Sequence, residues 1–142
     1  MDYAFWDSSA LVPLCLQQKA TPQAQLLSTQ YRITVWWATS IEMRGAFARL
    51  LRVGQLSSNG QVVAQVELEH FRNAWREIEP TERLREQAER LVDRFPLKAA
   101  DAQQLAAALA WCSGRPRLRA FISGDAQLLE AAAQLGFRTL TV

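Results

Sequence analysis

The sequence predicts an α/β fold, namely a three-layer α/β/α sandwich around a central, mostly parallel sheet. Short apolar runs typical of buried strands alternate with longer amphipathic runs typical of helices. Hydrophobic residues make up 49% of the chain, which is enough for one core without disulfides. The length of 142 residues fits one domain, and no repeat or linker divides it, so we expect a single domain over residues 1–142.

The predicted strands are short and rich in aromatic and β-branched residues. The first is almost wholly apolar until it ends at Asp7, as expected of a strand covered on both faces. The five predicted strands span residues 3–7, 32–36, 76–79, 119–123 and 138–142. We expect the last of them to lie at an edge of the sheet.

Prolines, glycines and capping residues set the predicted helix boundaries. Thr21 precedes Pro22, so we expect Thr21 to be the N-cap of a helix. Gly54 and Gly136 each close a helix, because glycine readily adopts the left-handed conformation found there. Pro13 lies within the first helix, where a cap or a kink is expected. The predicted helices span about 9–17, 22–30, 40–53, 58–75, 81–94, 97–111 and 125–135.

Composition excludes several classes of protein. No apolar stretch reaches the roughly 20 residues that span a membrane, and the first residues do not resemble a secretory signal. Cys15 and Cys112 lie far apart in apolar contexts, so we interpret them as buried free thiols and expect a cytoplasmic protein. A net charge of +2 is too small to indicate nucleic-acid binding by itself.

Four acidic residues stand where their carboxylates could meet. Asp7 and Asp125 each follow a predicted strand, and ligands of parallel sheets bind beyond the carboxyl ends of strands where the strand order reverses. Glu42 and Asp101 lie in the first turns of two helices, and Asp101 has mainly small and apolar neighbours. Each acid alone could instead cap a helix or complement its dipole, and that alternative stays open.

Four carboxylates suit one kind of chemistry in particular. Mg²⁺ and Mn²⁺ prefer oxygen ligands, and with such ions a phosphodiester bond is cleaved without a side-chain nucleophile or a histidine base. The only histidine, His70, lies on a charged helix and is interpreted as a solvated surface residue.

These segments together resemble the PIN domain, and specifically the VapC-type toxins of bacterial toxin–antitoxin pairs. The resemblance covers the whole chain in order. Its motifs are Trp6-Asp7-Ser8-Ser9-Ala10-Leu11-Val12, Glu42-Met43-Arg44-Gly45-Ala46-Phe47, Ala99-Ala100-Asp101-Ala102-Gln103-Gln104-Leu105-Ala106 and Phe121-Ile122-Ser123-Gly124-Asp125-Ala126-Gln127-Leu128.

The resemblance implies a metal-dependent endoribonuclease with RNA as substrate and Mg²⁺ or Mn²⁺ as cofactor. It assigns catalysis and metal binding to Asp7, Glu42, Asp101 and Asp125. Ser9 and Ser123 match hydroxyl positions that would order the carboxylates, although capping or strand-end hydrogen bonding explains them equally well. It also implies a cognate antitoxin as partner. The chain departs from the family in two places. Gln103-Gln104 replaces a common Leu-His or similar pair, and Gly124 replaces an aromatic residue.

Other residues have both a functional and a structural interpretation. Arg44, Arg115, Arg117 and Arg119 could contact RNA phosphates or could simply be solvated. Trp36 and Trp37 could stack on bases, but we favour one in the core and the other against a helix or a dimer partner, and we expect a homodimer. The apolar residues of the 58–75 helix suit a core face or an antitoxin groove; they are Val62, Val63, Val66 and Phe71.

Three other functions remain as alternatives. A phosphatase or receiver domain is disfavoured because Ser9 occupies the position of the second acid that a dehalogenase-type phosphatase needs. The chain is short for a flap-type DNA nuclease. A catalytically weak PIN-like binding module that acts through partner-protein complexes stays open, because intact acids do not exclude it.

Overall fold

The computed structural model describes all residues from Met1 to Val142. It contains a five-stranded, wholly parallel sheet with the strand order β3-β2-β1-β4-β5. The strands are β1 (Asp2–Trp6), β2 (Tyr31–Trp36), β3 (Arg76–Ile78), β4 (Ala120–Ser123) and β5 (Arg138–Thr141). All five predicted strands are therefore confirmed, and β5 forms an edge as expected.

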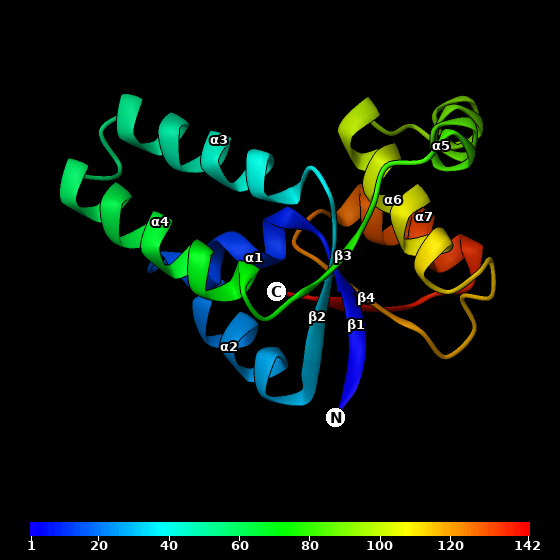
Figure 1. The fold of residues 1–142 in the computed structure, drawn as a ribbon, viewed down its shortest axis with the longest axis horizontal. Helices are drawn as coiled ribbons and strands as arrows, with labels where there is room; N and C mark the ends of the chain where they lie inside the picture. The colour runs from blue at the N-terminus through cyan, green and yellow to red at the C-terminus, as the bar shows by residue number, and fades with distance from the viewer.

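Seven helices cover the two faces of the sheet, which confirms the predicted three-layer sandwich (Figure 1). They are α1 (Ser8–Cys15), α2 (Thr21–Gln30), α3 (Thr39–Arg52), α4 (Ser58–Arg72), α5 (Glu82–Arg94), α6 (Ala99–Trp111) and α7 (Ala126–Leu135). Helices α1 to α4 pack on one face, and α5 to α7 pack on the other. No helix combines the length and the apolar character that crossing a membrane requires.

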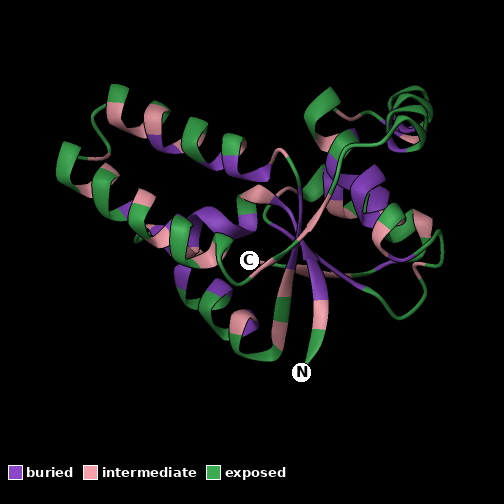
Figure 2. Ribbon diagram, in the orientation of Figure 1, coloured by how far each residue is buried: buried purple, intermediate pink, exposed green.

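Two hydrophobic clusters, one on each face of the sheet, form the core. Alternate residues of the central strand β1 serve the two clusters: Phe5 packs toward α6, and Ala4 and Trp6 pack toward α1 and α3. Both cysteines are free and buried within these clusters, as the sequence predicted. Figure 2 shows burial concentrated in the middle of the sheet and on the helix faces turned toward it.

Helices α3 and α4 form a long hairpin that extends from the body of the molecule (Figure 1). Its outer surface is partly apolar, because the side chains of Val62, Val63 and Val66 on α4 are at least half exposed. The interpretation of these three valines as core residues is therefore wrong, whereas Phe71 on the same helix does pack against the core.

The start of α2 differs from the prediction. Thr21 is the first residue of α2 and Ala20 is its N-cap, so the prediction for Thr21 is wrong. Its hydroxyl accepts a hydrogen bond from the Gln18 amide and donates to the carbonyl of Pro13, at 2.8 and 2.7 Å. The side chain that was expected to cap α2 therefore ties the α1–α2 turn back to α1. Pro13 itself lies inside α1.

Candidate active site

Strands β1 and β4 are neighbours, and the strand order reverses between them. Asp7 follows β1 directly and Asp125 follows β4 after one further residue, so both lie at the carboxyl edge of the sheet at its switch point. The backbone amide of Asp7 donates to the carbonyl of Ile122 at 2.9 Å, which joins the two strand ends. The two acids therefore follow neighbouring strand ends at the same edge of the sheet.

Ser9 and Ser123 hold the Asp7 carboxylate. Both hydroxyls donate to Oδ2 of Asp7, that of Ser123 at 2.9 Å. In turn, the backbone amide of Gly124 donates to Ser9 Oγ at 2.8 Å, and that of Asp125 donates to Ser123 Oγ at 2.9 Å. The two serines therefore order a carboxylate, as the resemblance implies, and Ser123 also fixes the end of its own strand.

Asp7 is almost fully buried and has no cationic partner. Burial raises the pKa of its carboxyl above the ordinary value, and the hydrogen bonds from the two serines act in the opposite direction. Although Asp7 occupies the N-cap position of α1, its side chain makes no capping hydrogen bond. The backbone amides of Ser8 and Ser9, at the start of α1, also lower the pKa of Asp7, so its carboxylate interacts with the helix start as well as with the two hydroxyls.

Asp125, by contrast, does cap a helix. Its Oδ1 accepts hydrogen bonds from the backbone amides of Gln127 and Leu128 at 2.9 and 3.2 Å, at the start of α7. Its Oδ2 accepts none. Capping and a place in the acidic site are compatible here, because the cap occupies one oxygen and leaves the other available.

Glu42 of α3 is held by a residue from the opposite face of the sheet. The side-chain amide of Gln104, on α6, donates to Glu42 Oε1 and to Thr39 Oγ1, the latter at 3.2 Å. Burial raises the pKa of Glu42 to about 7. The hydrogen bond from Gln104 lowers it, and repulsion from Asp7 and Asp101 raises it. Gln104 is fully buried, and its Oε1 has no hydrogen-bond partner.

Asp101 lies in the first turn of α6, one turn before Gln104. Burial raises the pKa of Asp101 to about 6, and repulsion from Asp7 and Asp125 adds to the rise, whereas Lys98 lowers it. Asp101 is therefore close enough to Asp7 and Asp125 to be repelled by both, and Glu42 is repelled by Asp7 and Asp101. No lysine or arginine forms an ion pair with any of them.

The donor set fits a hard divalent cation. It consists of oxygen atoms alone, and Asp7, Glu42 and Asp125 are each held mainly through one carboxylate oxygen, with the second left free or nearly so. No three acidic, histidine or cysteine side chains are gathered into a ligating group in this structure. The acids surround a common region without closing on it.

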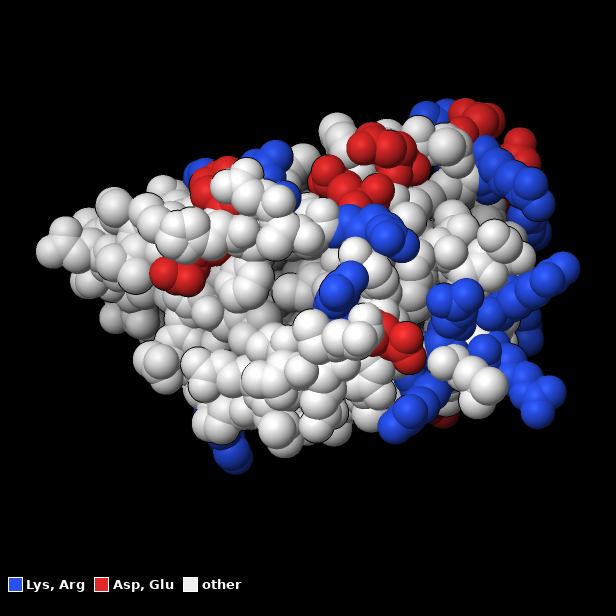
Figure 3. Space-filling model, turned by 60° about the horizontal axis from the view of Figure 1, so that its bottom comes forward, with Lys and Arg blue, Asp and Glu red and all other residues white.

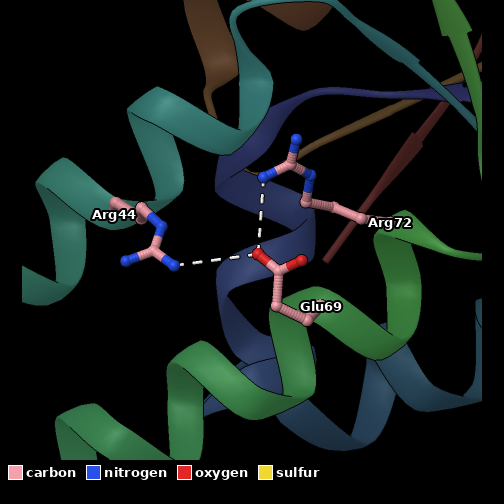
Figure 4. Close-up of polar contacts among 3 residues, drawn as sticks. All are labelled: Arg44, Glu69 and Arg72. Carbon is pink, nitrogen blue, oxygen red and sulfur yellow. Dashed lines mark hydrogen bonds and ion pairs between the residues drawn. The ribbon is translucent and has the colours of Figure 1, made fainter.

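The four predicted RNA-contacting arginines do not lie with the acids. Arg44 turns toward α4, where Glu69 accepts ion pairs from Arg44 at 3.7 Å and from Arg72 at 3.4 Å (Figure 4). Arg115, Arg117 and Arg119 precede β4, so they lie at the amino edge of the sheet, opposite the acids. Only Gln104 joins the site without having been singled out as a site residue. A polar side chain on the buried face of an alanine-rich helix was the available signal.

No family model and no curated protein matches the sequence. Several solved structures have a similar fold. PAE2754 from Pyrobaculum aerophilum shares 19% identity with a TM-score of 0.67, over 96% of this chain and 88% of its own. VapBC2 from Rickettsia felis, bound to a DNA fragment from its promoter, shares 12% identity with a TM-score of 0.66, over 99% of each chain. A toxin–antitoxin complex from Klebsiella pneumoniae shares 16% identity with a TM-score of 0.59, over 86% of each chain. The chain therefore has a PIN-like three-layer α/β/α fold.

Proposed function

We propose that this chain is a metal-dependent endoribonuclease and the toxin of a type II toxin–antitoxin pair. One observation carries the proposal: four carboxylates from different elements lie around the switch point of the sheet, and none of them forms an ion pair. Burial and mutual repulsion raise the pKa of Glu42 and of Asp101. Such an arrangement costs stability in the absence of a ligand, and functional sites are where such costs are found.

Asp7, Glu42, Asp101 and Asp125 would hold Mg²⁺ or Mn²⁺. When bound, such an ion lowers the pKa of a coordinated water and stabilises the oxygen that leaves the phosphodiester. This chemistry needs no nucleophilic side chain. The one histidine, His70, is exposed on α4, consistent with its interpretation as a surface residue.

The chain's own contribution is to fix the carboxylates. Ser9 and Ser123 orient Asp7, the start of α7 orients Asp125, and Gln104 orients Glu42. Because each contact comes from a different element, the site depends on the packing of both helical layers against the sheet. Preorganised ligands reduce the reorganisation needed when substrate and ion bind.

The partner part of the proposal rests on the fold and on exposed apolar residues. Two of the similar structures contain more than a lone chain: one is a toxin–antitoxin complex, and the other is bound to promoter DNA. In this chain Ile41 of α3 and Val62, Val63 and Val66 of α4 are at least half exposed along the hairpin. A cognate antitoxin with an apolar segment would cover them, and the toxin would act as a homodimer.

The test is cleavage of a mixed-sequence RNA by purified protein with Mg²⁺, with Mn²⁺ and with EDTA. Asp7→Asn and Asp125→Asn should abolish cleavage, and EDTA should stop the wild type. Asp93→Asn, which alters an acid of α5 outside the cluster, is the matched control and should cleave normally. Cleavage by Asp7→Asn at the wild-type rate would contradict the proposal.

A second candidate is a PIN-like binding module with weak or no catalysis. It is favoured by the absence of a gathered ligating group in this structure. Calorimetry with Mn²⁺ separates the two functions. If the wild type binds Mn²⁺ and cleaves RNA, and Asp7→Asn loses the binding, the nuclease is supported. If the wild type does neither, the binding module is supported.

A further inference from the structure

The amino edge of the sheet, opposite the acids, carries a second concentration of functional side chains. Three arginines lie at the start of different strands there: Arg76 begins β3, Arg32 is near the start of β2, and Arg119 directly precedes β4. All three are exposed, and none forms an ion pair with a carboxylate. Figure 3 shows Lys and Arg gathered toward the right-hand side of one face, with Asp and Glu along its upper part and one acidic group beside them.

Aromatic rings underlie these arginines. The guanidinium groups of Arg76 and Arg32 lie 4.0 and 5.7 Å from the centre of the Tyr3 ring. The guanidinium of Arg119 lies 5.4 Å from the centre of the Trp111 ring. Stacking on a ring orders the guanidinium while leaving its N–H groups free to bind an anion.

A cavity of about 350 Å³ joins the two arginine–aromatic pairs. Tyr3, Arg76, Trp111 and Arg119 all line it, and Asp2 is the one acidic residue that does. Leu118, beside Arg119, also lines it; its side chain is 84% exposed and its backbone is held at a φ of 65°. A bulky residue held in the left-handed region and turned to solvent is uncommon, and such positions are concentrated at functional sites.

We propose that this amino-edge surface, formed by Tyr3, Arg32, Arg76, Trp111, Leu118 and Arg119, binds single-stranded RNA. Unpaired arginines attract phosphates, and flat or apolar side chains between them accept unstacked bases, which is the combination that single-stranded nucleic acid requires. The cavity can receive an unstacked base but is too small for a duplex to enter. The choice of RNA over other polyanions rests on the proposed nuclease function, with this surface holding a substrate segment remote from the bond that is cut.

The surface and the acids are separated by at least the length of the central strand. Five residues of β1 span about 16 Å, so an RNA must be longer than a few nucleotides to touch both sites. Short RNAs should therefore be insensitive to changes in the amino-edge surface, whereas long RNAs should respond to them.

The experiment measures binding of a fluorescein-labelled U20 RNA in EDTA, over a series of salt concentrations, so that no cleavage contributes. Arg76→Gln and Arg119→Gln should each reduce the slope of log K against log salt by about 0.7, and the double variant should bind roughly tenfold more weakly. Asp2→Asn should bind more tightly. Arg52→Gln, at the far end of α3, removes the same charge elsewhere and should bind like the wild type.

Unchanged salt slopes in the Arg76→Gln and Arg119→Gln variants would overturn the proposal. An equally large loss of U20 affinity in Arg52→Gln would overturn it as well. Tighter binding of a 20-base-pair DNA duplex or of poly-glutamate than of U20, with the same dependence on Arg76 and Arg119, would assign the surface to a different polyanion and refute the RNA assignment. Because binding is measured without cleavage, the binding result stands even if the nuclease assay fails. If cleavage is found, the double variant should raise KM for U20 and leave a tetranucleotide unaffected.

Discussion

The acidic site should destabilise the metal-free protein, and Glu42 allows the magnitude to be worked out. Its pKa rises from 4.5 to about 7 on folding. One pKa unit corresponds to about 1.4 kcal/mol, so the full shift corresponds to about 3 kcal/mol. Because Glu42 is only partly buried, solvent screening reduces this to about 1–2 kcal/mol.

The sign follows from proton binding. Between pH 4.5 and about 7 the folded state holds a proton on Glu42 that the unfolded state has lost, so stability falls as the pH rises through this range. Glu42→Gln removes the titration and keeps an oxygen that can accept from Gln104. We expect the free energy of unfolding of the variant to exceed that of the wild type by about 1–2 kcal/mol at pH 8, which corresponds to a rise of about 4 °C in Tm. At pH 4 the difference should nearly vanish.

The assay is thermal unfolding followed by circular dichroism in EDTA from pH 4 to pH 9. Glu86→Gln is the control, because Glu86 is an exposed glutamate of α5 that forms no ion pair. A stabilisation of equal size at pH 4 and pH 8, or destabilisation by Glu42→Gln at every pH, would refute the electrostatic reasoning.

Four further results are expected. Asp7→Asn should keep the fold and unfold at the same or a higher temperature in EDTA than the wild type, because it removes a buried charge. Ser123→Ala should cost about 1–3 kcal/mol in chemical denaturation, since Asp7 and the Asp125 amide both lose a partner. Gln104→Leu should cost about 1–3 kcal/mol, since Glu42 and Thr39 both lose a donor, and should move the pH profile of cleavage upward, because Glu42 loses the hydrogen bond that lowers its pKa. Light scattering should give twice 16.0 kDa; a monomer at all concentrations would contradict the dimer.

The sequence was sufficient for the features that depend on local pattern. Strand positions, the helix cap at Asp125 and the left-handed Gly136 follow from residue types and their spacing, and the structure confirms them. The meeting of Asp7 and Asp125 was also predictable, because both follow strands and parallel strands end at one edge.

Features that depend on distant contacts were not predictable in the same way. Gln104 meets Glu42 across 62 positions of sequence, and Thr21 turns back to Pro13 instead of capping α2. For Arg115, Arg117 and Arg119 the sequence did contain the signal. They precede a strand while the acids follow strands, so the two groups had to lie at opposite edges of a parallel sheet.

The pairing of β1 with β4 has a consequence for synthesis of the protein. Asp7 is synthesised well before Ser123, which fixes its carboxylate and lies 116 positions later in the chain. Until then β1 can pair with β2 alone and exposes a free edge, which favours association with other chains. Closing so long a loop is also slow compared with forming the local helices. A nascent chain therefore carries Asp7 without its hydrogen-bond partner Ser123, and the acidic cluster forms only after β4 has been synthesised.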